Sequence, residues 1–287
     1  MKKWNLLIDV AKCFNCNCCA LACHDEYHGN DFPGYAAEMP KHGQRWIDIR
    51  QRETGEQPMV EMSYLPVMCN HCDDPPCLKV AKNGAVVKRP DGIVLIVPEK
   101  ARGQREIVDA CPYHAVHWNE EKQLPQAWPF DAHLLDQGWT RTRGPQLCPT
   151  QAMRTLHVSD AEMQDLVERE GLEVLSPEYR ARPRVYYRNL ARFLSVFIGG
   201  ALTQAVAGVV DCAAGVQVAL MQGDKVIAEQ TSDTFGEFRF RNLKPGSGTY
   251  KLCIDAAQPL DVEVKQQSVY LGAIELASLR SPECVTD

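Results

Sequence analysis

The sequence predicts an α+β protein in which a loop-rich, cysteine-rich domain precedes a small all-β sandwich. Three observations lead to this prediction. Nine of the 13 cysteines lie within the first 111 of the 287 residues, where regular apolar patterns are short. One helical pattern with clear end signals follows near residue 160. Short alternating strands then recur from about Ser195 onward. We therefore expect three parts: residues 1–155, a helix with a connecting arm over 156–195, and the sandwich over 196–287.

The first part has only two runs apolar enough for buried strands, Asn5–Val10 and Gly92–Val97. Loops rich in Pro, Gly, Asn and Asp separate them, for example 31–34 and 72–77. A domain with so little regular core is typical of proteins in which bound metal supplies the cohesion that packing would otherwise give.

The middle part begins with a helix. Ser159 and Glu162 form a capping-box pattern, apolar residues then recur at helical spacing, and Gly171 ends the helix. Residues 172–195 form an irregular arm, because Pro177 and Pro183 exclude long regular elements. An arginine-rich run in this arm is either a solvated basic face or a contact with a partner subunit; it comprises Arg180, Arg182, Arg184, Arg188 and Arg192.

The last part alternates apolar and polar residues in short runs separated by Gly, Asp, Asn and Pro. The expected strands are 216–220, 225–231, 238–240, 250–254 and 262–264. Such spacing favours a small β-sandwich. The stretch Phe235–Phe238, followed by Leu243–Gly246, resembles the turn-and-strand signature of transthyretin-like and adhesin B-type domains.

Charge and hydropathy exclude several classes of function. The net charge of −6 argues against nucleic-acid binding, which needs a basic field. No stretch reaches the length of a membrane span, and the N-terminus lacks a secretory pattern. We therefore expect a cytoplasmic protein, in a reducing compartment where clustered cysteines more often bind metal than form disulfides.

The cysteines near the N-terminus fall into two groups with ligand spacing. Cys13, Cys16 and Cys19 are each separated by two residues, and Cys23 follows; the second group is Cys69, Cys72 and Cys77. Three such cysteines on one loop can bind three corners of a 4Fe–4S cubane, with the fourth corner bound by a distant cysteine. Cys111 and Cys148 each precede a proline, as the distant ligand does in bacterial ferredoxins. This pattern predicts a bacterial ferredoxin-like, cluster-binding domain.

Two other roles for these cysteines are less favoured. Structural zinc needs two Cys-x2-Cys pairs, which 13/16 and 69/72 would provide, but it would leave Cys19, Cys77 and both Cys-Pro positions without a role. A catalytic cysteine would need an assigned His/Asp set, which the sequence does not offer. His24 and His71 are interpreted as loop histidines beside ligands.

The chain resembles the iron–sulfur subunits of the molybdopterin (dimethyl sulfoxide reductase) superfamily, above all the small subunits of pyrogallol–phloroglucinol transhydroxylase and resorcinol hydroxylase. The resemblance covers nearly the whole chain, including the β-rich tail. It lies in the stretches IDVAKCFNCNCC, NGAVVKRPDGIVLIVPEKARG, DACPY, AHLLD, RPRVYYRNL and FGEFRF.

The resemblance implies which cysteines share a cluster. The family pattern has four cysteine groups, and each cubane takes three cysteines from one group and the last cysteine of its paired group. Two complete sets remain here, a first tetrad of Cys13, Cys16, Cys19 and Cys148, and a second tetrad of Cys69, Cys72, Cys77 and Cys111.

The same pattern implies that two other cubanes are lost. Ala81 replaces the last cysteine of group two, and group three keeps only Cys111. In group four, Trp128, Asp131 and Gly144 stand at cysteine positions. Cys23, whose cluster is thereby lost, becomes an orphan, as does Cys18. Of the cysteines in the tail, Cys212 and Cys253 are expected to be buried apolar side chains, and Cys284 has no assigned role.

The resemblance further implies the function. The chain would be a non-catalytic subunit that relays electrons through two 4Fe–4S clusters. A large partner subunit, in a heterodimer or higher assembly, would hold molybdenum bis-pterin guanine dinucleotide and hydroxylate a resorcinol-type polyphenol in anaerobic aromatic degradation. Hydroxylation with water releases two electrons, which would leave through this subunit to a downstream acceptor. The alternatives are an electron buffer in a redox-neutral transhydroxylase, an independent ferredoxin-like carrier, and a zinc-stabilised interaction protein.

Overall fold

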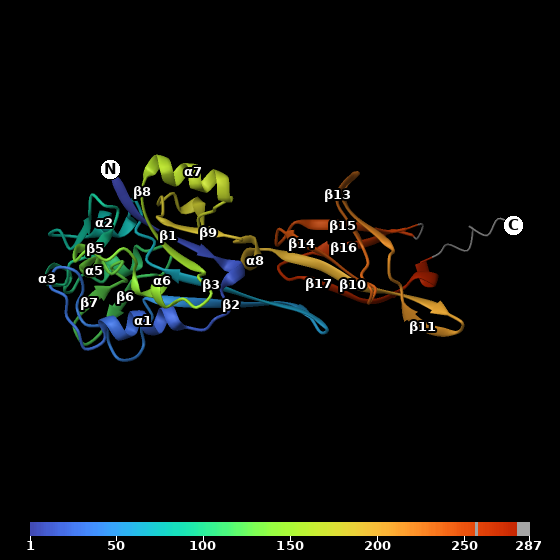
Figure 1. The fold of residues 1–287 in the computed structure, drawn as a ribbon, viewed down its shortest axis with the longest axis horizontal. Helices are drawn as coiled ribbons and strands as arrows, with labels where there is room; N and C mark the ends of the chain where they lie inside the picture. Colours follow the sequence, from blue (N-terminus) through green and yellow to red (C-terminus); the bar gives the residue numbers. More distant parts are fainter. Residues whose placement is uncertain (256–257, 280–287) are drawn as a thin grey trace. The chain divides into compact units, whose positions relative to one another are not determined.

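The computed structural model describes residues 1–255 and 258–279, and its contacts divide the chain into two compact units (Figure 1). The first unit comprises Met1–Gln51 and Ser63–Leu190. The second comprises Arg52–Met62 and the chain from Ala191 onward. The sequence does not indicate that a segment near residue 57 belongs with the tail.

A three-stranded sheet lies in the first unit, in the order β8-β1-β9. The central strand β1 (Lys2–Asp9) confirms the expected N-terminal strand, and its Leu6, Leu7 and Ile8 are almost fully buried. It pairs antiparallel with β8 (Met153–Ser159) and parallel with β9 (Val185–Arg188). The expected arm 172–195 is therefore less irregular than predicted, because β9 within it completes this sheet.

The other elements before α7 are two-stranded hairpins and short helices, and the tip of the first hairpin, Arg52–Met62, belongs to the second unit. The hairpins pair β2 (Ile47–Glu56) with β3 (Met59–Met68), β4 (Val86–Lys88) with β5 (Val94–Ile96), and β6 (His117–Asn119) with β7 (Leu124–Gln126). The helices are η1 (Val10–Lys12), α1 (Cys18–Tyr27), α2 (Pro76–Val80), α3 (Pro98–Ala101), α4 (Glu106–Asp109), α5 (Ala132–Asp136) and α6 (Arg143–Leu147). These elements are short because the chain returns repeatedly to the cysteine loops.

The predicted helix after Ser159 is α7 (Asp160–Glu170). The Ser159 side chain accepts from the backbone N–H of Glu162, and the Glu162 carboxylate accepts from the backbone N–H of Ser159, which confirms the capping box. Gly171 ends the helix with φ +59°. Two further short helices follow, η2 (Pro177–Tyr179) and α8 (Ala191–Leu194).

The second unit is a β-sandwich built from two four-stranded sheets. One contains β10 (Val196–Val206), β11 (Val209–Cys212), β14 (Glu237–Leu243) and β17 (Val269–Glu275). The other has the order β13-β12-β15-β16, formed by β12 (Gln217–Gln222), β13 (Lys225–Thr231), β15 (Gly248–Ile254) and β16 (Leu260–Val264). The last element is η3 (Leu276–Leu279).

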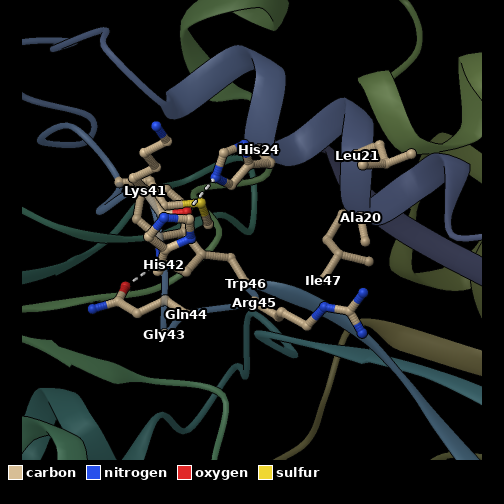
Figure 2. Close-up of a pocket in the computed structure, with 11 residues that line it drawn as sticks. Ala20, Leu21, His24, Lys41, His42, Gly43, Gln44, Arg45, Trp46 and Ile47 are labelled. Carbon is tan, nitrogen blue, oxygen red and sulfur yellow. Dashed lines mark hydrogen bonds between the residues drawn. The ribbon is translucent and has the colours of Figure 1, made fainter.

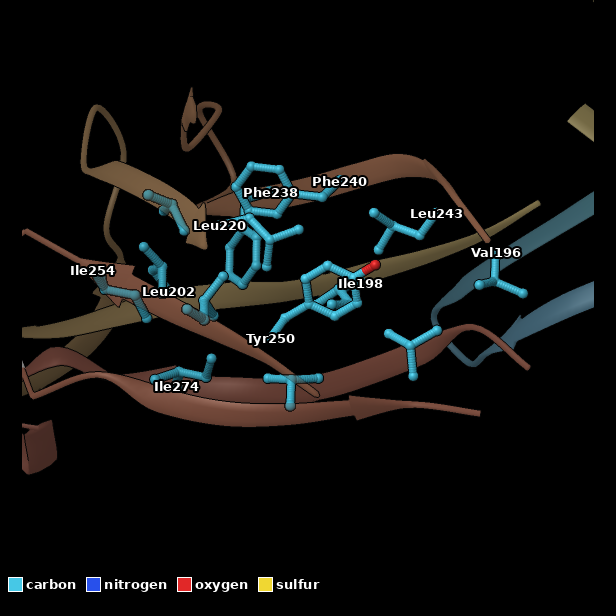
Figure 3. Close-up of a cluster of buried hydrophobic side chains, with 14 of the residues drawn as sticks. Val196, Ile198, Leu202, Leu220, Phe238, Phe240, Leu243, Tyr250, Ile254 and Ile274 are labelled. Atoms are coloured by element: carbon cyan, nitrogen blue, oxygen red, sulfur yellow. The ribbon is translucent and has the colours of Figure 1, made fainter. Parts of the chain in front are cut away.

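Both sheets of the sandwich contribute to one apolar core (Figure 3). Ile198 and Leu202 from β10 and Phe240 from β14 lie with Leu220 from β12 and Tyr250 from β15 in this core. Alternate residues of β12, β15 and β16 face inward, as the period-two pattern of the sequence indicates, whereas Val196–Gly200 of β10 are all buried.

No helix within the described part of the chain is long and apolar enough to span a membrane.

Candidate metal centres

The second tetrad gathers around one cavity. Cys69, Cys72, Cys77 and Cys111 all line it, together with Pro75, Val94, Tyr113 and neighbouring residues. Cys69 and Cys72 follow strand β3, Cys77 lies in α2, and Cys111 follows α4. The structure thus brings together the four cysteines of this set, although they are spread over 43 positions of the chain.

Electrostatics within the second tetrad disfavour a set of bare thiolates. Burial raises the pKa of Cys72 to about 12 and that of Cys77 to about 11, and the charge of Cys111 adds to both. Burial likewise raises the pKa of Cys69, with Cys77, Cys111 and Cys72 adding. Because metal ligands must be deprotonated, four thiolates can coexist here only around a cationic centre.

The cysteines of the first tetrad lie close enough for their charges to act on one another. Burial raises the pKa of Cys19 to about 12, and the charges of Cys13, Cys148 and Cys16 add to that rise. Burial also raises the pKa of Cys13, with Cys148 and Cys16 as the neighbouring charges. Each of the three loop cysteines therefore lies near the distant Cys148 or near another member of the set. The backbone N–H of Ala152 donates to Cys148 Sγ at 3.2 Å.

The loops that hold the cysteines use left-handed residues. Asn15 and Asn17 have φ of 64° and 61°, and His71 has φ of 45°. Asn tolerates this conformation better than most residues, and it lets the chain turn tightly between successive ligands. Backbone N–H groups then reach the sulfurs: that of His71 donates to Cys69 and that of Leu78 to Cys77.

The chemistry of the second cavity fits a 4Fe–4S cluster. The hydroxyl of Tyr113, which is 6% exposed, finds no hydrogen-bond partner among the described residues, and the residue lines the cavity. A cluster would supply acceptor sulfurs for this donor. Within residues 1–255 and 258–279, no three His, Cys, Asp or Glu side chains are arranged to hold a single metal ion. The second tetrad instead surrounds a shared space, as the four corners of a cubane require.

The four positions at which the family pattern would place a further cluster, Cys23, Trp128, Asp131 and Gly144, lie close together and hold only one cysteine. The Asp131 carboxylate accepts hydrogen bonds from Trp128 Nε1 (2.8 Å), Tyr27 Oη (2.9 Å) and the backbone N–H of Arg143 (2.7 Å). Cys23 is fully buried beside it, and burial and the Asp131 charge raise the pKa of this thiol. We call Tyr27, Trp128 and Asp131 the plug.

Gly144 and the plug together border both tetrads. A Cβ added at Gly144 would lie 3.4 Å from Cβ of Cys19, which belongs to the first tetrad. On the other side, the Trp128 ring lies 5.6 Å from the ring of His71, which stands between Cys69 and Cys72. His71 Nδ1 accepts from the backbone N–H of Val94.

Apolar side chains surround Ala81, which stands where the family pattern has the last cysteine of group two. Ala81 packs against a cluster that includes Ala85, Ala101 and Ile107, the last two from the segment that precedes Cys111. This region is therefore a small apolar core.

Two expectations are wrong. Arg184 is neither a solvated nor an exposed contact residue, because it is 2% exposed and pairs through Nε and Nη2 with both carboxylate oxygens of Asp73 (2.7 and 2.6 Å). Cys212 is exposed rather than buried. Cys253 is half-buried, with its thiol 3.5 Å from the sulfur of Met221. Cys284 lies outside the described residues.

A separate cavity of about 480 Å³ lies beside α1 (Figure 2). Ala20, Leu21 and His24 of α1 face the segment 41–47, where Trp46 Nε1 donates to Gln44 Oε1 (2.8 Å) and His24 Nε2 lies 3.2 Å from the carbonyl oxygen of Lys41. No tetrad cysteine lines this cavity, so it is distinct from the cluster sites.

Comparisons with known proteins agree with this chemistry. Residues 60–157 match the model of a 4Fe–4S dicluster domain. The chain is 42% identical over 96% of its length to the whole of the pyrogallol hydroxytransferase small subunit of Pelobacter acidigallici. It is 31% identical to a tetrathionate reductase subunit of Salmonella typhimurium, covering 66% of this chain and 73% of that protein. It is 35% identical to the beta subunit of dimethylsulfide dehydrogenase of Rhodovulum sulfidophilum, covering 52% and 46%.

Proposed function

Because the chain belongs to the family of molybdoenzyme iron–sulfur subunits that includes the pyrogallol hydroxytransferase small subunit, we propose that it is the electron-transfer subunit of a polyphenol hydroxylase. It binds two 4Fe–4S clusters, one on each tetrad. The observation that supports this count is the contrast between the two tetrads and the plug. Each tetrad keeps all four cysteines close together, whereas three of the four positions of the group-four cluster hold Trp128, Asp131 and Gly144.

Each cluster, when bound, takes up and releases one electron at a time. The polypeptide holds each one through four thiolates and tunes it through the groups around them. Backbone N–H groups at His71, Leu78 and Ala152 already donate to ligand sulfurs, and Tyr113 has a donor to spare.

The partner is a large subunit with molybdenum bis-pterin guanine dinucleotide, which hydroxylates a resorcinol-type substrate with water. The two electrons released leave through this subunit to a downstream acceptor in the cytoplasm. The sandwich is a transthyretin-like or adhesin B-type module that acts as a structural cap on the partner.

The cluster count has a direct test. Iron and acid-labile sulfide are measured per chain on anaerobically purified protein. Two cubanes give about eight of each. About twelve would overturn the argument from the plug, and an iron-free, colourless protein with zinc would favour the interaction-protein alternative.

A second candidate is an electron buffer in a redox-neutral transhydroxylase, and the 42% identity to a pyrogallol hydroxytransferase subunit favours it. The purified complex is incubated with resorcinol and an artificial electron acceptor. Resorcinol-dependent reduction of the acceptor supports the hydroxylase; product that forms only with a polyphenol co-substrate supports the buffer. If the chain purifies from native extract without a large molybdenum subunit, the independent carrier replaces both.

A further inference from the structure

The backbone around the two tetrads is alike. A helix begins beside one ligand of each set, α1 at Cys18–Cys19 and α2 at Pro76–Cys77. A short helix also precedes each Cys-Pro ligand, α6 before Cys148 and α4 before Cys111. The positive N-terminal ends of α1 and α2 therefore favour negative charge at both sites. The side chains around the two tetrads differ more than these backbone elements do.

Cations surround the second tetrad. Lys88 Nζ donates to the carbonyl oxygens of His71 (2.9 Å) and Gly92 (2.7 Å), and it pairs with Asp73 at 2.9 Å. His71 and Asp73 flank Cys72 in the chain, so the ammonium of Lys88 lies beside a ligand of the second tetrad. Arg184 pairs with the same Asp73 and with the exposed Asp160. Asp73 is thus paired with two cations, whereas Asp160 and Glu178, the other carboxylates on this side, are exposed and therefore screened by solvent.

Tyr113 adds a hydrogen-bond donor beside the second tetrad. Its ring lines the cavity of the second tetrad, and Cys72 and Cys111 are the charges that, after burial, raise its pKa most. Its hydroxyl is buried without a partner among the described residues. A donor in this position can bond only to what the cavity contains. A hydrogen bond to a cluster or ligand sulfur stabilises the more negative, reduced state.

The net charge of the groups near the first tetrad is negative. Asp131 is fully buried, and burial raises the pKa of its carboxyl; the three donors from which it accepts oppose that rise and favour the ionised form. Through Arg143 and Gly144 it lies one short stretch of backbone from Cys19. The Arg143 guanidinium does not offset it, because that cation pairs with both Asp25 and Glu26. Lys12 and Arg45 are exposed and therefore screened by solvent.

We propose that Lys88 and Tyr113 give the cluster on the second tetrad a higher reduction potential than the cluster on the first tetrad, which Asp131 lowers. An added electron is stabilised by a nearby cation or donor and destabilised by a nearby buried anion. Electrons entering at the first tetrad then pass to the second and rest there. This inference depends on the proposed pair of clusters, and it assigns Lys88, Tyr113 and Asp131 as tuning residues that bind no metal themselves.

The experiment is redox potentiometry of the full chain, with the electron paramagnetic resonance signals of the two clusters followed separately. Tyr113→Phe removes only an unpartnered hydroxyl and is expected to lower the higher of the two potentials. Lys88→Gln is expected to lower the same one. Tyr179→Phe is the control for Tyr113, because the two rings lie 5.3 Å apart but Tyr179 is exposed. Asp131→Asn is expected to raise the lower potential, and Asp165→Asn, an exposed change of the same charge, is its control.

The outcomes separate this inference from the cluster count. The inference is supported by about eight irons per chain and two signals, provided that Tyr113→Phe and Lys88→Gln both lower the higher of the two reduction potentials. The proposed order of potentials is overturned if Tyr113→Phe shifts the lower of the two reduction potentials, or if neither variant shifts a potential. Two clusters would still be present in either case. An iron content far from eight overturns the proposed function itself, independently of the potentials.

Discussion

The indole N–H of Trp128 donates a 2.8 Å hydrogen bond to Oδ1 of Asp131, so two positions that hold cysteines in the family pattern are bonded to each other. Tyr27 donates to the same oxygen from helix α1. The polar side-chain atoms of Tyr27, Trp128 and Asp131 are therefore hydrogen-bonded to one another in the plug. A buried carboxylate left with no donors would cost several kcal/mol.

The roles of Cys19 and Cys23 can be separated by substitution. Both are buried on α1, one turn apart, but only Cys19 belongs to a tetrad. We expect Cys19→Ala to remove about four of eight irons, because a cubane needs all four ligands. Cys23→Ala should leave the iron content unchanged and cost about 1 kcal/mol of unfolding free energy for the small cavity. Loss of iron in the Cys23 variant would contradict its assignment as an orphan.

The lost cluster should be recoverable. The triple variant Trp128→Cys, Asp131→Cys and Gly144→Cys completes a ligand set with Cys23. A Cβ at Gly144 meets only ordinary contacts, 3.4 Å to Cys19 and 3.6 Å to Ile47, and removal of the indole opens space. After anaerobic reconstitution we expect iron to rise to about twelve per chain. Adding Cys23→Ala to this background should return it to about eight; a content that stays at twelve would mean that the extra iron is bound elsewhere.

In the sandwich, the absence of a Cβ matters more at Gly236 than at Gly215. Both have positive φ, +75° and +77°, but a Cβ at Gly236 would overlap the carbonyl oxygen of Leu202, whereas a Cβ at Gly215 meets nothing. We expect Gly215→Ala to cost about 1 kcal/mol through backbone strain alone. Gly236→Ala should cost clearly more, measured by thermal unfolding. Iron content should be the same in both variants, since both tetrads lie in the first unit; equal melting temperatures would argue against the overlap.

Glu61 provides a pH-dependent contribution to the second unit. Burial acts to raise the pKa of this carboxyl, but hydrogen bonds from Arg239 (2.7 Å) and Arg241 (2.8 Å) outweigh it and leave the pKa below its usual 4.5. A depressed pKa stabilises the fold at neutral pH, and that stabilisation is lost as pH falls through the folded-state pKa.

Glu61→Gln should therefore lower stability at pH 7 by about 1 kcal/mol. Its difference from the parent chain should shrink as pH falls below 4.5. Urea unfolding at a series of pH values measures this, with the exposed Glu229→Gln as the control for loss of one charge. A difference that is constant with pH would show that the ion pairs do not stabilise the unit.

The candidate site could be predicted from the sequence further than the fold could. Ligand spacing is local, so the grouping at Cys13–Cys19 and Cys69–Cys77 is visible in one loop each, and the capping box at Ser159 is equally local. The burial of Arg184 cannot be predicted from the sequence because its partner Asp73 lies 111 positions away. Strand β10 is not predicted either, because Gly199, Gly200 and Gln204 interrupt its apolar run and its pairing with β11, β14 and β17 is not visible in the sequence. For Tyr113, the sole signal was its place two residues after Cys111.

The sandwich takes part of its structure from the hairpin tip Arg52–Met62. Gly55, Met59 and Glu61 from this tip meet Phe197, Gly199 and Arg239 of the same unit. The module is therefore discontinuous in the gene. A single stop codon after Leu190 would leave the tip without its partners, and a transplanted segment starting at Ala191 would lack the tip. Gain or loss of this module in descent requires two coordinated genetic changes, one of them inside the cluster-binding half.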